Sequence, residues 1–556
     1  MAPSQQPDVI VVGAGLAGLV ATYELTRAGR RVLVLDQENR NNLGGQAFWS
    51  LGGLFFVDSP EQRRLGIKDS FDLAWQDWQG SAGFDREDQD LWGRQWARAY
   101  VEFATNEKRR YLHDLGLRVT PLVGWAERGG SSADGHGNSV PRFHLTWGTG
   151  PEVVRVFLEP VLAAEQRGLV EFAFRHQVDE LIVQDGTVVG ARGSVLEPTD
   201  LDRGKASSRE VMGEFEFRAP AVIVSSGGIG HNHELIRKNW PTERLGPCPQ
   251  HMIPGVPAYV DGRMLAITET AGGQIVNRDR MWHYTEGLHN WDPIWPDHAI
   301  RIIPGPSSMW FDANGKRLAA PNFPGFDTNA SMQAILSTGY DYSWFVLNQT
   351  IVEKEFMLSG SEQNPDITGK DLKFTLQSRV AKGPSGPVDA FLKHGVDFVT
   401  ARTLPELVEG MNKLARGPQL DPADIERQIV ARDREVANKY SKDAQVMAIG
   451  NARRAIGDKL ARVASPHRIL DPAHGPLIGV RLNVLTRKTL GGIQTNLNSQ
   501  VIASDGTPFA GLYAAGEVAG FGGGGVHGYN ALEGTFLGGC IFSGRAAGLA
   551  LARTAR

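Results

Sequence analysis

Near its N-terminus the chain has two apolar, strand-like runs with a helical pattern between them. Val9–Val12 is an uninterrupted apolar run, short enough for a buried parallel strand. Ala17–Arg27 has the pattern of a helix, and Arg31–Leu35 is a second strand-like run that ends at Asp36. The N-terminal segment therefore predicts a strand, a helix and a second strand in direct succession.

Helical and strand patterns continue along the chain. Helices are expected over 59–120, Pro151–Arg167, Pro405–Leu414, Asp421–Ser441 and Leu532–Ala552. Strands are expected at Val170–Val178, Glu180–Val189, Phe215–Val224 and Leu512–Ala515, with hairpin turns at Asp185–Gly186 and Asp505–Gly506. Residues 126–139 are polar and predict an exposed loop.

A glycine motif lies between the first strand and its helix. Gly13, Gly15 and Gly18 have the spacing G-x-G-x-x-G, which permits a tight turn, close approach to a pyrophosphate and helix–strand packing. The helix N-terminus offers free N–H groups to phosphates. Asp36 follows Gly18 by 18 residues, close to the spacing of a carboxylate that binds a ribose hydroxyl. The motif indicates FAD or NAD rather than NADP, and it does not choose between the first two.

Two further glycine-rich turns are candidates for contact with the same dinucleotide. Gly44, Gly45, Gly52 and Gly53 lie in one loop, which can wrap the second half of a dinucleotide or simply lie on the surface. Ser226 and Gly227 follow the strand expected at Phe215–Val224, and they form either a cofactor contact or an ordinary strand-to-helix turn.

Composition limits the classes of function. A chain of 556 residues needs roughly two to four domains. Its net charge of −4 argues against a nucleic-acid partner. Cys248 and Cys540 provide neither metal-ligand spacing nor a disulfide framework, which suits a reducing cytoplasm. We expect no signal peptide and no membrane span.

Aromatic residues become dense from about residue 277. Five of the 13 tryptophans lie in Trp282–Trp344, together with Tyr284, Tyr340 and Tyr342. We expect a separate domain here that runs to about residue 470. Its aromatic side chains either line an apolar pocket or anchor a core.

The chain resembles the fumarate reductase/succinate dehydrogenase flavoprotein superfamily, in its 3-ketosteroid dehydrogenase-like branch. The resemblance lies in the N-terminal glycine motif, in SSGGIG at 225–230, and in GLYAAGEV and GGVHGYNALEG near the C-terminus. The resemblance implies an α/β, Rossmann-type FAD-binding domain, 1–276 and 471–556, interrupted by an α+β capping domain, 277–470. It also implies noncovalent FAD, since no histidine lies in 46–53. The residues expected to contact FAD are Gly13, Ala14, Gly15, Leu16, Ala17, Gly18, Asp36, Gln37, Gly44, Gly45, Gln46, Leu51, Gly52, Gly53, Val178, Ser226, Gly227, Gly516, Glu517, Gly534, Thr535, Phe536 and Leu537.

The chain departs from the dicarboxylate-binding pattern of the fumarate reductases. Ala531 stands where those enzymes carry an arginine, and Lys488 stands where they carry a histidine. No arginine follows the segment Gly315–Leu318 at the position of their proton donor. Because carboxylate recognition relies on arginine forks, fumarate is not expected as a substrate.

The resemblance instead suggests α,β-dehydrogenation of a hydrophobic cyclic ketone. Tyr529 occupies the position of a tyrosine that polarises the ketone, although Glu533 stands where the ketosteroid enzymes use a glycine. Candidates for the proton-accepting group are Tyr284, Tyr340, Tyr342 and His283. The cations that would assist it are Arg487 and Lys488. Each of these side chains has an alternative role in packing.

Other functions remain open from the sequence. The same pocket would serve reduction of an activated C=C bond, with electrons from another partner. A binding-only flavoprotein is a third possibility. NAD-dependent dehydrogenation is disfavoured, because no second G-x-G-x-x-G unit occurs. We expect a small hydrophobic substrate, an unidentified electron acceptor or donor, and no metal.

Overall fold

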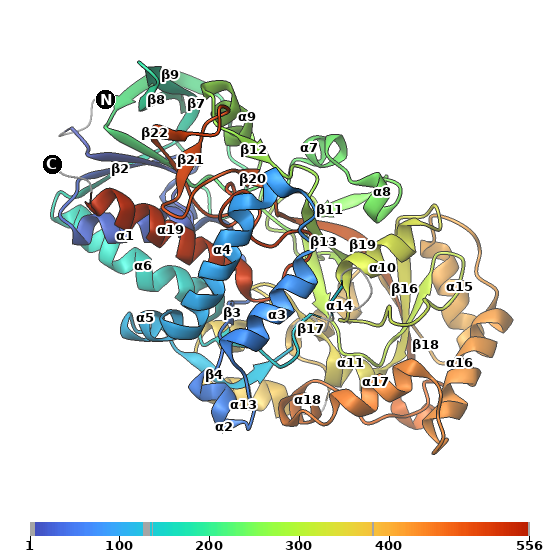
Figure 1. Cartoon of the computed structure of the whole chain (residues 1–556). Coiled ribbons are helices and arrows are strands. Elements are labelled where there is room, and N and C mark those ends of the chain that lie inside the picture. The colour runs from blue at the N-terminus through green and yellow to red at the C-terminus, as the bar shows by residue number, and fades with distance from the viewer. Residues whose placement is uncertain (1–5, 126–133, 136, 381–382, 554–556) are drawn as a thin grey trace.

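The computed structural model describes residues 6–125, 134–135, 137–380 and 383–553. Two large sheets lie side by side in Figure 1, each with its own covering of helices. The polar loop expected over 126–139 falls mostly outside the described residues.

The first sheet combines strands from the N-terminal and the C-terminal parts of the chain. Its parallel part runs in the order β6 (Val170–Phe174), β2 (Val32–Asp36), β1 (Val9–Val12), β10 (Ala221–Val224) and β22 (Pro508–Ala514). In register, Val12 of β1 pairs with Leu35 of β2 and Val224 of β10, so the carboxyl ends of these strands meet at one edge. Ligands of open α/β sheets bind in the crevice outside this edge.

An antiparallel layer extends the first sheet beyond β22. It contains β7 (His176–Gln184), β8 (Thr187–Leu196) and β9 (Val211–Arg218), while β21 (Gln500–Ile502) pairs with β22. The hairpin turns at Asp185–Gly186 and Asp505–Gly506 are confirmed. The strand predicted over Phe215–Val224 is in fact two strands, because Pro220 lacks the N–H that would continue the ladder. The strand predicted over Val170–Val178 also divides, at Arg175, whose φ is 61°.

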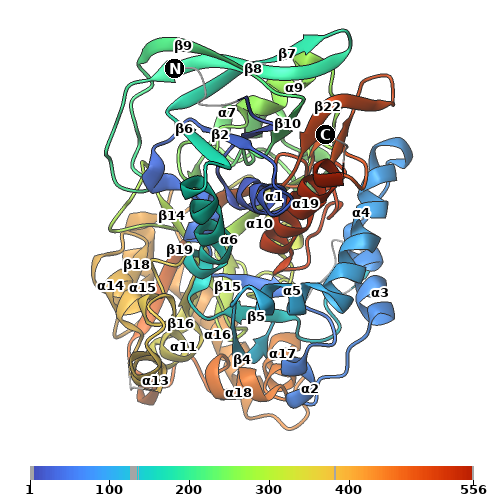
Figure 2. The ribbon, with the colours of Figure 1, turned by 90° about the vertical axis from the view of Figure 1, so that its left-hand side faces the viewer.

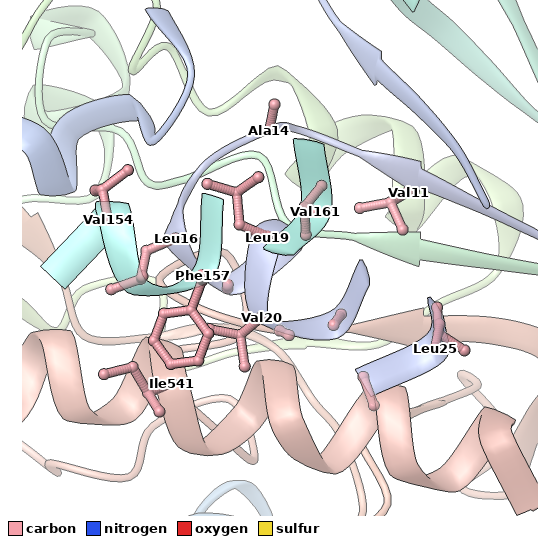
Figure 3. Packing of buried hydrophobic residues seen from close by; sticks show 14 of the residues in the cluster. Val11, Ala14, Leu16, Leu19, Val20, Leu25, Val154, Phe157, Val161 and Ile541 are labelled. Carbon is pink, nitrogen blue, oxygen red and sulfur yellow. The ribbon is translucent and has the colours of Figure 1, made fainter. Parts of the chain in front are cut away.

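Two helices pack against the helix of the first βαβ unit, α1 (Leu16–Arg27). They are α6 (Thr149–Gln166) and α19 (Thr535–Arg553). Figure 3 shows the Phe157 ring of α6 between Ile541 of α19 and Val20 of α1. A Cβ on Gly544 of α19 would lie 2.4 Å from the carbonyl oxygen of Ala17, so the close approach of α19 to α1 requires glycine. In the part of the chain that the structure describes, α19 alone is long and apolar enough to cross a membrane, and it is largely buried against these neighbours.

The second sheet is built around one long strand. Its order is β15 (Met309–Asp312), β16 (Tyr342–Asn348), β19 (Leu477–Thr489), β13 (Met281–His289), β14 (Ala299–Ile303) and β17 (Met357–Leu358). The short strands β11 (Met252–Pro254) and β18 (Phe398–Ala401) also pair with β19. This sheet extends past both ends of the expected capping domain, 277–470, and that division stays a prediction. β19 runs from the capping region back to the first sheet.

Helices and small strands complete the structure. Those before the capping region are α2 (Pro60–Arg64), α3 (Phe71–Ala82), α4 (Glu87–Asn106), α5 (Lys108–Asp114), α7 (His233–Lys238), α8 (Thr242–Leu245), α9 (Arg263–Ala271) and the sheet β3 (Gly53–Phe55), β5 (Phe143–Thr146), β4 (Val119–Gly124). Those of the capping region are α10 (Thr328–Leu336), α11 (Gln349–Glu355), α12 (Pro365–Thr368), α13 (Leu372–Val380), α14 (Gly386–His394), α15 (Leu404–Leu414), α16 (Pro422–Val436), α17 (Ala444–Ala452) and α18 (Ile456–Ala461). β12 (Ile275–Val276) pairs with β20 (Gly492–Ile493), and the 3₁₀ turns are Arg40–Asn42, Gly45–Trp49 and Pro472–His474. In Figure 2, α1, α6 and α19 lie between the first sheet and the capping region.

Candidate active site

The glycine motif forms a cradle at the carboxyl edge of the first sheet. A Cβ on Gly13 would lie 2.7 Å from the Ser225 carbonyl oxygen, and one on Gly18 would lie 2.1 Å from the Gly13 carbonyl oxygen. By contrast, a Cβ on Gly15 would meet no atom closer than 3.9 Å. Gly13 and Gly18 are therefore required by the fold, whereas Gly15 leaves room in front of the N-terminus of α1.

Asp36 closes this cradle. Its Oδ2 accepts a hydrogen bond from Ala14 N at 2.8 Å, and its Oδ1 accepts one from Glu38 N at 2.8 Å. Burial raises the pKa of Asp36 to about 6. Each oxygen keeps a further lone pair, so the carboxylate can also accept hydrogen bonds from ribose hydroxyls.

A cavity of about 120 Å³ lies in front of this cradle. Of the residues expected to contact FAD, those that line it are Gly13, Gly15, Leu16, Ala17, Asp36, Gln37, Gly44, Gly45, Gln46, Val178, Ser226, Gly227, Gly516 and Glu517. Ala14 and Gly18 do not line it: Ala14 N donates to Asp36, and Gly18 packs on the Gly13 backbone. The free N–H groups at the start of α1, the open face of Gly15 and the Asp36 carboxylate together fit a dinucleotide.

A hydrogen-bonded network connects this cavity to a larger one. Lys488 Nζ donates to Gln46 Oε1 at 3.1 Å, and Gln46 Nε2 donates to Glu517 Oε2 at 2.5 Å. Thr489 N donates to Glu517 Oε1 at 2.9 Å. Gln46 and Glu517 line both cavities. The end of β19 is thus tied to the loops that hold the dinucleotide.

The larger cavity has a volume of about 790 Å³ and is lined by residues of the second sheet, of the small sheet β3–β5–β4 and of the start of α19. Among the predicted residues it is lined by Gln46, Leu51, Gly53, Tyr284, Lys488, Glu517, Gly534, Phe536 and Leu537. Gly52 and Thr535 line neither cavity: Gly52 packs on the Thr149 backbone, and Thr535 Oγ1 contacts His527 Nε2 at 2.9 Å.

One wall of the larger cavity carries a buried tyrosine–carboxylate pair. Tyr284 OH donates to Glu533 Oε1 at 2.9 Å. Arg301 Nη1 donates to the same oxygen at 3.2 Å, and its guanidinium carbon lies 3.6 Å from the centre of the Tyr284 ring. Trp282 Nε1 contributes a longer contact of 3.4 Å. Burial and the neighbouring Glu533 charge raise the pKa of Tyr284 well above its usual value.

Charged side chains are frequent around this cavity. Those among the described residues that line it are Arg118, Arg301, Lys354, Lys370, Arg462, Arg487 and Lys488, and Glu353, Asp458, Glu517 and Glu533. Burial lowers the pKa of both Lys488 and Arg487. No three His, Cys, Asp or Glu side chains come together as metal ligands within the described ranges.

Tyr529 does not line either cavity. Its hydroxyl donates to Asp85 Oδ2 at 3.0 Å, and its ring lies between the guanidinium groups of Arg244 and Arg280, at 3.6 and 4.2 Å. The structure therefore places Tyr529 in a structural cluster of arginines and not beside the site of Tyr284.

The other proposed proton acceptors also lie outside the cavity. His283 precedes Tyr284 on β13 and points to the opposite side, where it stacks on Trp240 and its Nδ1 accepts from Arg487 N at 3.1 Å. Burial lowers the pKa of His283 to about 3. Tyr340 and Tyr342 contact each other with ring centres 6.3 Å apart, in the packed interior of the capping region.

Two residues of the wall, Glu533 and Arg301, were not among the predicted site residues. Arg487 was predicted only as a cation that could assist the proton acceptor. Glu533 carried a signal, since it replaces a family glycine beside the motif at Gly534. Arg301 carried none, because its place opposite Glu533 depends on the pairing of β14 with β13.

A protein-family model described as an FAD binding domain matches residues 8–537. A KsdD-like steroid dehydrogenase of Mycobacterium tuberculosis is 63% identical over 549 residues, which cover 99% of this chain and 96% of the relative. The chain belongs to this FAD-binding family. A KsdD-like steroid dehydrogenase of Mycolicibacterium smegmatis is 62% identical and covers 95% of this chain and 96% of its own length.

Solved structures agree on the fold. A 3-ketosteroid delta1-dehydrogenase from Sterolibacterium denitrificans has a TM-score of 0.65 at 15% identity, covering 99% of this chain and all of its own. The predicted resemblance, the α/β fold with its cap and the FAD cofactor are confirmed. The protein is an FAD-dependent dehydrogenase.

Proposed function

We propose that the protein catalyses α,β-dehydrogenation of a hydrophobic cyclic ketone of the 3-ketosteroid class. Relatives at 62–63% identity are named steroid dehydrogenases. The observation that carries the proposal is the Tyr284–Glu533 pair, which faces the larger cavity next to Gly534, Phe536 and Leu537. Dehydrogenation removes the proton on the carbon next to the ketone, and this step needs a proton acceptor beside the substrate.

FAD, when bound, supplies the acceptor for the hydride that leaves the β-carbon. The chain supplies the acceptor for the α-proton. Tyr284 is protonated at neutral pH because its pKa is raised, so it accepts a proton only as its own proton passes to Glu533 Oε1, 2.9 Å away. Arg301 holds Glu533 in place through its hydrogen bond to Oε1.

The ketone oxygen also needs a donor, because it gains negative charge as the α-proton leaves. Lys488 lines the cavity and uses one of its protons on Gln46. Its remaining protons are available to an oxygen atom of a ligand. The apolar part of the wall, which includes Leu51, Phe143 and Phe356, would exclude water from the reacting atoms.

The test is anaerobic reduction of the bound flavin by 3-ketosteroids and by smaller cyclic ketones. Loss of flavin absorbance with a saturated 3-ketosteroid, together with a product that contains one more C=C bond, would support the proposal. If no ketone bleaches the flavin, and only an external reductant followed by an unsaturated ketone produces turnover, the reaction runs as C=C reduction and the proposal is wrong.

A further inference from the structure

Arg487 is a basic side chain of the cavity wall that forms no ion pair among the described residues, whereas Arg118 and Lys354, which also form none, donate to backbone carbonyl oxygens. Arg487 lies near the end of β19 and lines the larger cavity. Its backbone N–H donates to His283, but among the described residues no carboxylate oxygen lies within 4.0 Å of its guanidinium, and no side-chain hydrogen bond is formed. Arg301 and Lys488, its basic neighbours on the wall, contact Glu533 and Gln46 respectively.

An arginine without an ion pair is costly in this half-buried position, although the charges of Glu362 and Glu517 nearby offset part of the cost. The guanidinium stays protonated in proteins, so it cannot relieve the cost by losing its proton. A buried charge that lacks a partner costs several kcal/mol, although water in the cavity offsets part of this. A ligand carboxylate would remove the cost through two parallel N–H···O bonds.

The charge of the whole cavity agrees with an anionic ligand. Seven basic and four acidic side chains line it among the described residues. The protein as a whole has the opposite balance, with a net charge of −4. A cavity of one sign in a protein of the other attracts counter-charged ligands. Without Arg487, six basic and four acidic side chains still line the cavity among the described residues.

The rest of the lining is apolar, so the ligand is not a small dicarboxylate. Leu51, Phe143, Trp147 and Phe356 lie on the wall, and this apolar lining does not match a four-carbon dicarboxylate, whichever part of the volume of about 790 Å³ FAD fills. The ligand that satisfies all these features has a large apolar body and an acidic group.

We propose that the substrate is a ring ketone that carries a carboxylate, and that Arg487 binds this carboxylate. The inference rests on the proposed dehydrogenation and adds the substrate class. The ketone end would lie at Tyr284 and Lys488, and the acid end at Arg487. Arg487 is then a specificity-determining residue, because it distinguishes acidic ketones from neutral ones.

The test compares a 3-ketosteroid with a short carboxylate side chain against its methyl ester. Binding to photoreduced, FAD-loaded enzyme is measured by equilibrium dialysis, which requires no turnover. We expect the acid to bind the wild type more tightly than the ester. Arg487→Gln should weaken binding of the acid by about tenfold to about a hundredfold, the effect of losing a hydrogen-bonded charge, and leave ester binding nearly unchanged.

Two controls make the result specific. Arg192→Gln removes the same charge from an exposed strand and should bind both ligands like the wild type. The visible spectrum and FAD content of Arg487→Gln should match those of the wild type. Loss of FAD would show that Arg487 serves the cofactor, and the inference would be wrong.

Other outcomes also overturn it. Equal affinities of wild type for acid and ester would exclude a carboxylate site. Equal weakening of both ligands in Arg487→Gln would place the arginine at the shared ketone. If the acid binds through Arg487 but reduces the flavin of the wild type no faster than buffer does, the dehydrogenation is wrong while the anion site stands.

Discussion

The Tyr284–Glu533 pair predicts that the reaction depends on the Tyr284 hydroxyl group. In Tyr284→Phe the hydrogen bond of 2.9 Å to Glu533 is lost, but Glu533 Oε1 keeps Arg301 at 3.2 Å and Trp282 at 3.4 Å. The phenyl ring can keep its contact with the Arg301 guanidinium, at 3.6 Å in the wild type. We therefore expect a loss of about 1–2 kcal/mol in the free energy of unfolding, and a folded protein that retains FAD.

The effect on the reaction should be much larger. A positioned acid–base group contributes about 10²–10⁴ in rate, which corresponds to about 3–5 kcal/mol in the activation barrier. Stopped-flow measurement of anaerobic flavin reduction by a 3-ketosteroid gives this rate directly. Tyr440→Phe is the matched control, since Tyr440 is 86% exposed and should reduce its flavin at the wild-type rate.

If Tyr284→Phe binds FAD and its flavin is reduced within about threefold of the wild-type rate, the hydroxyl does not take part in proton transfer. The same substitution with a slow rate but a large deuterium effect at the substrate α-carbon would support the role, since proton removal would then limit the reaction.

Three further predictions follow from the site. Gly15→Val should fold like the wild type but bind no FAD, because its side chain would fill the space in front of Gly15. Gly18→Ala should unfold at a lower urea concentration than the wild type, because its Cβ would lie 2.1 Å from a backbone oxygen. Flavin absorbance measures the first effect and urea titration the second. Tyr529→Phe should reduce its flavin within about twofold of the wild-type rate, because its hydroxyl faces Asp85; a loss like that of Tyr284→Phe would contradict the geometry. His283 has a pKa of about 3 in the folded protein, below its unfolded value, so its stabilising contribution is present above about pH 6.5 and is lost as the pH falls toward 3. His283→Asn should therefore reduce the slope of the free energy of unfolding against pH, measured by urea titration between pH 6.5 and 4.5, by up to about 1.4 kcal/mol per pH unit. An unchanged slope would contradict this.

The cofactor half of the site was predictable because its chemistry is local in sequence. Gly13, Gly15 and Asp36 occupy one strand–helix–strand unit, and their spacing alone places phosphates at a helix N-terminus and a carboxylate at a ribose. The same locality explains why Gly534 and Leu537, at the start of a C-terminal helix, could be assigned to the cofactor by resemblance.

The substrate half depends on distances that no local pattern records. Alternation along β13 means that either His283 or Tyr284 faces the cavity, but not both, and only the pairing with β19 decides which one. Tyr529 lies in a glycine-rich segment without periodicity, so counting from Thr535 could not show that its ring turns toward Arg244.

The partners of Glu533 also could not be read from the local sequence. A buried carboxylate in place of a glycine is destabilising unless partners from elsewhere neutralise it. Here the partners, Tyr284 and Arg301, come from the inserted region some 230 to 250 residues earlier, with separations of 249 and 232. A carboxylate at this position therefore requires the tyrosine and the arginine to be present with it, and the three should be read as one unit when the chemistry of the cavity is compared between related chains.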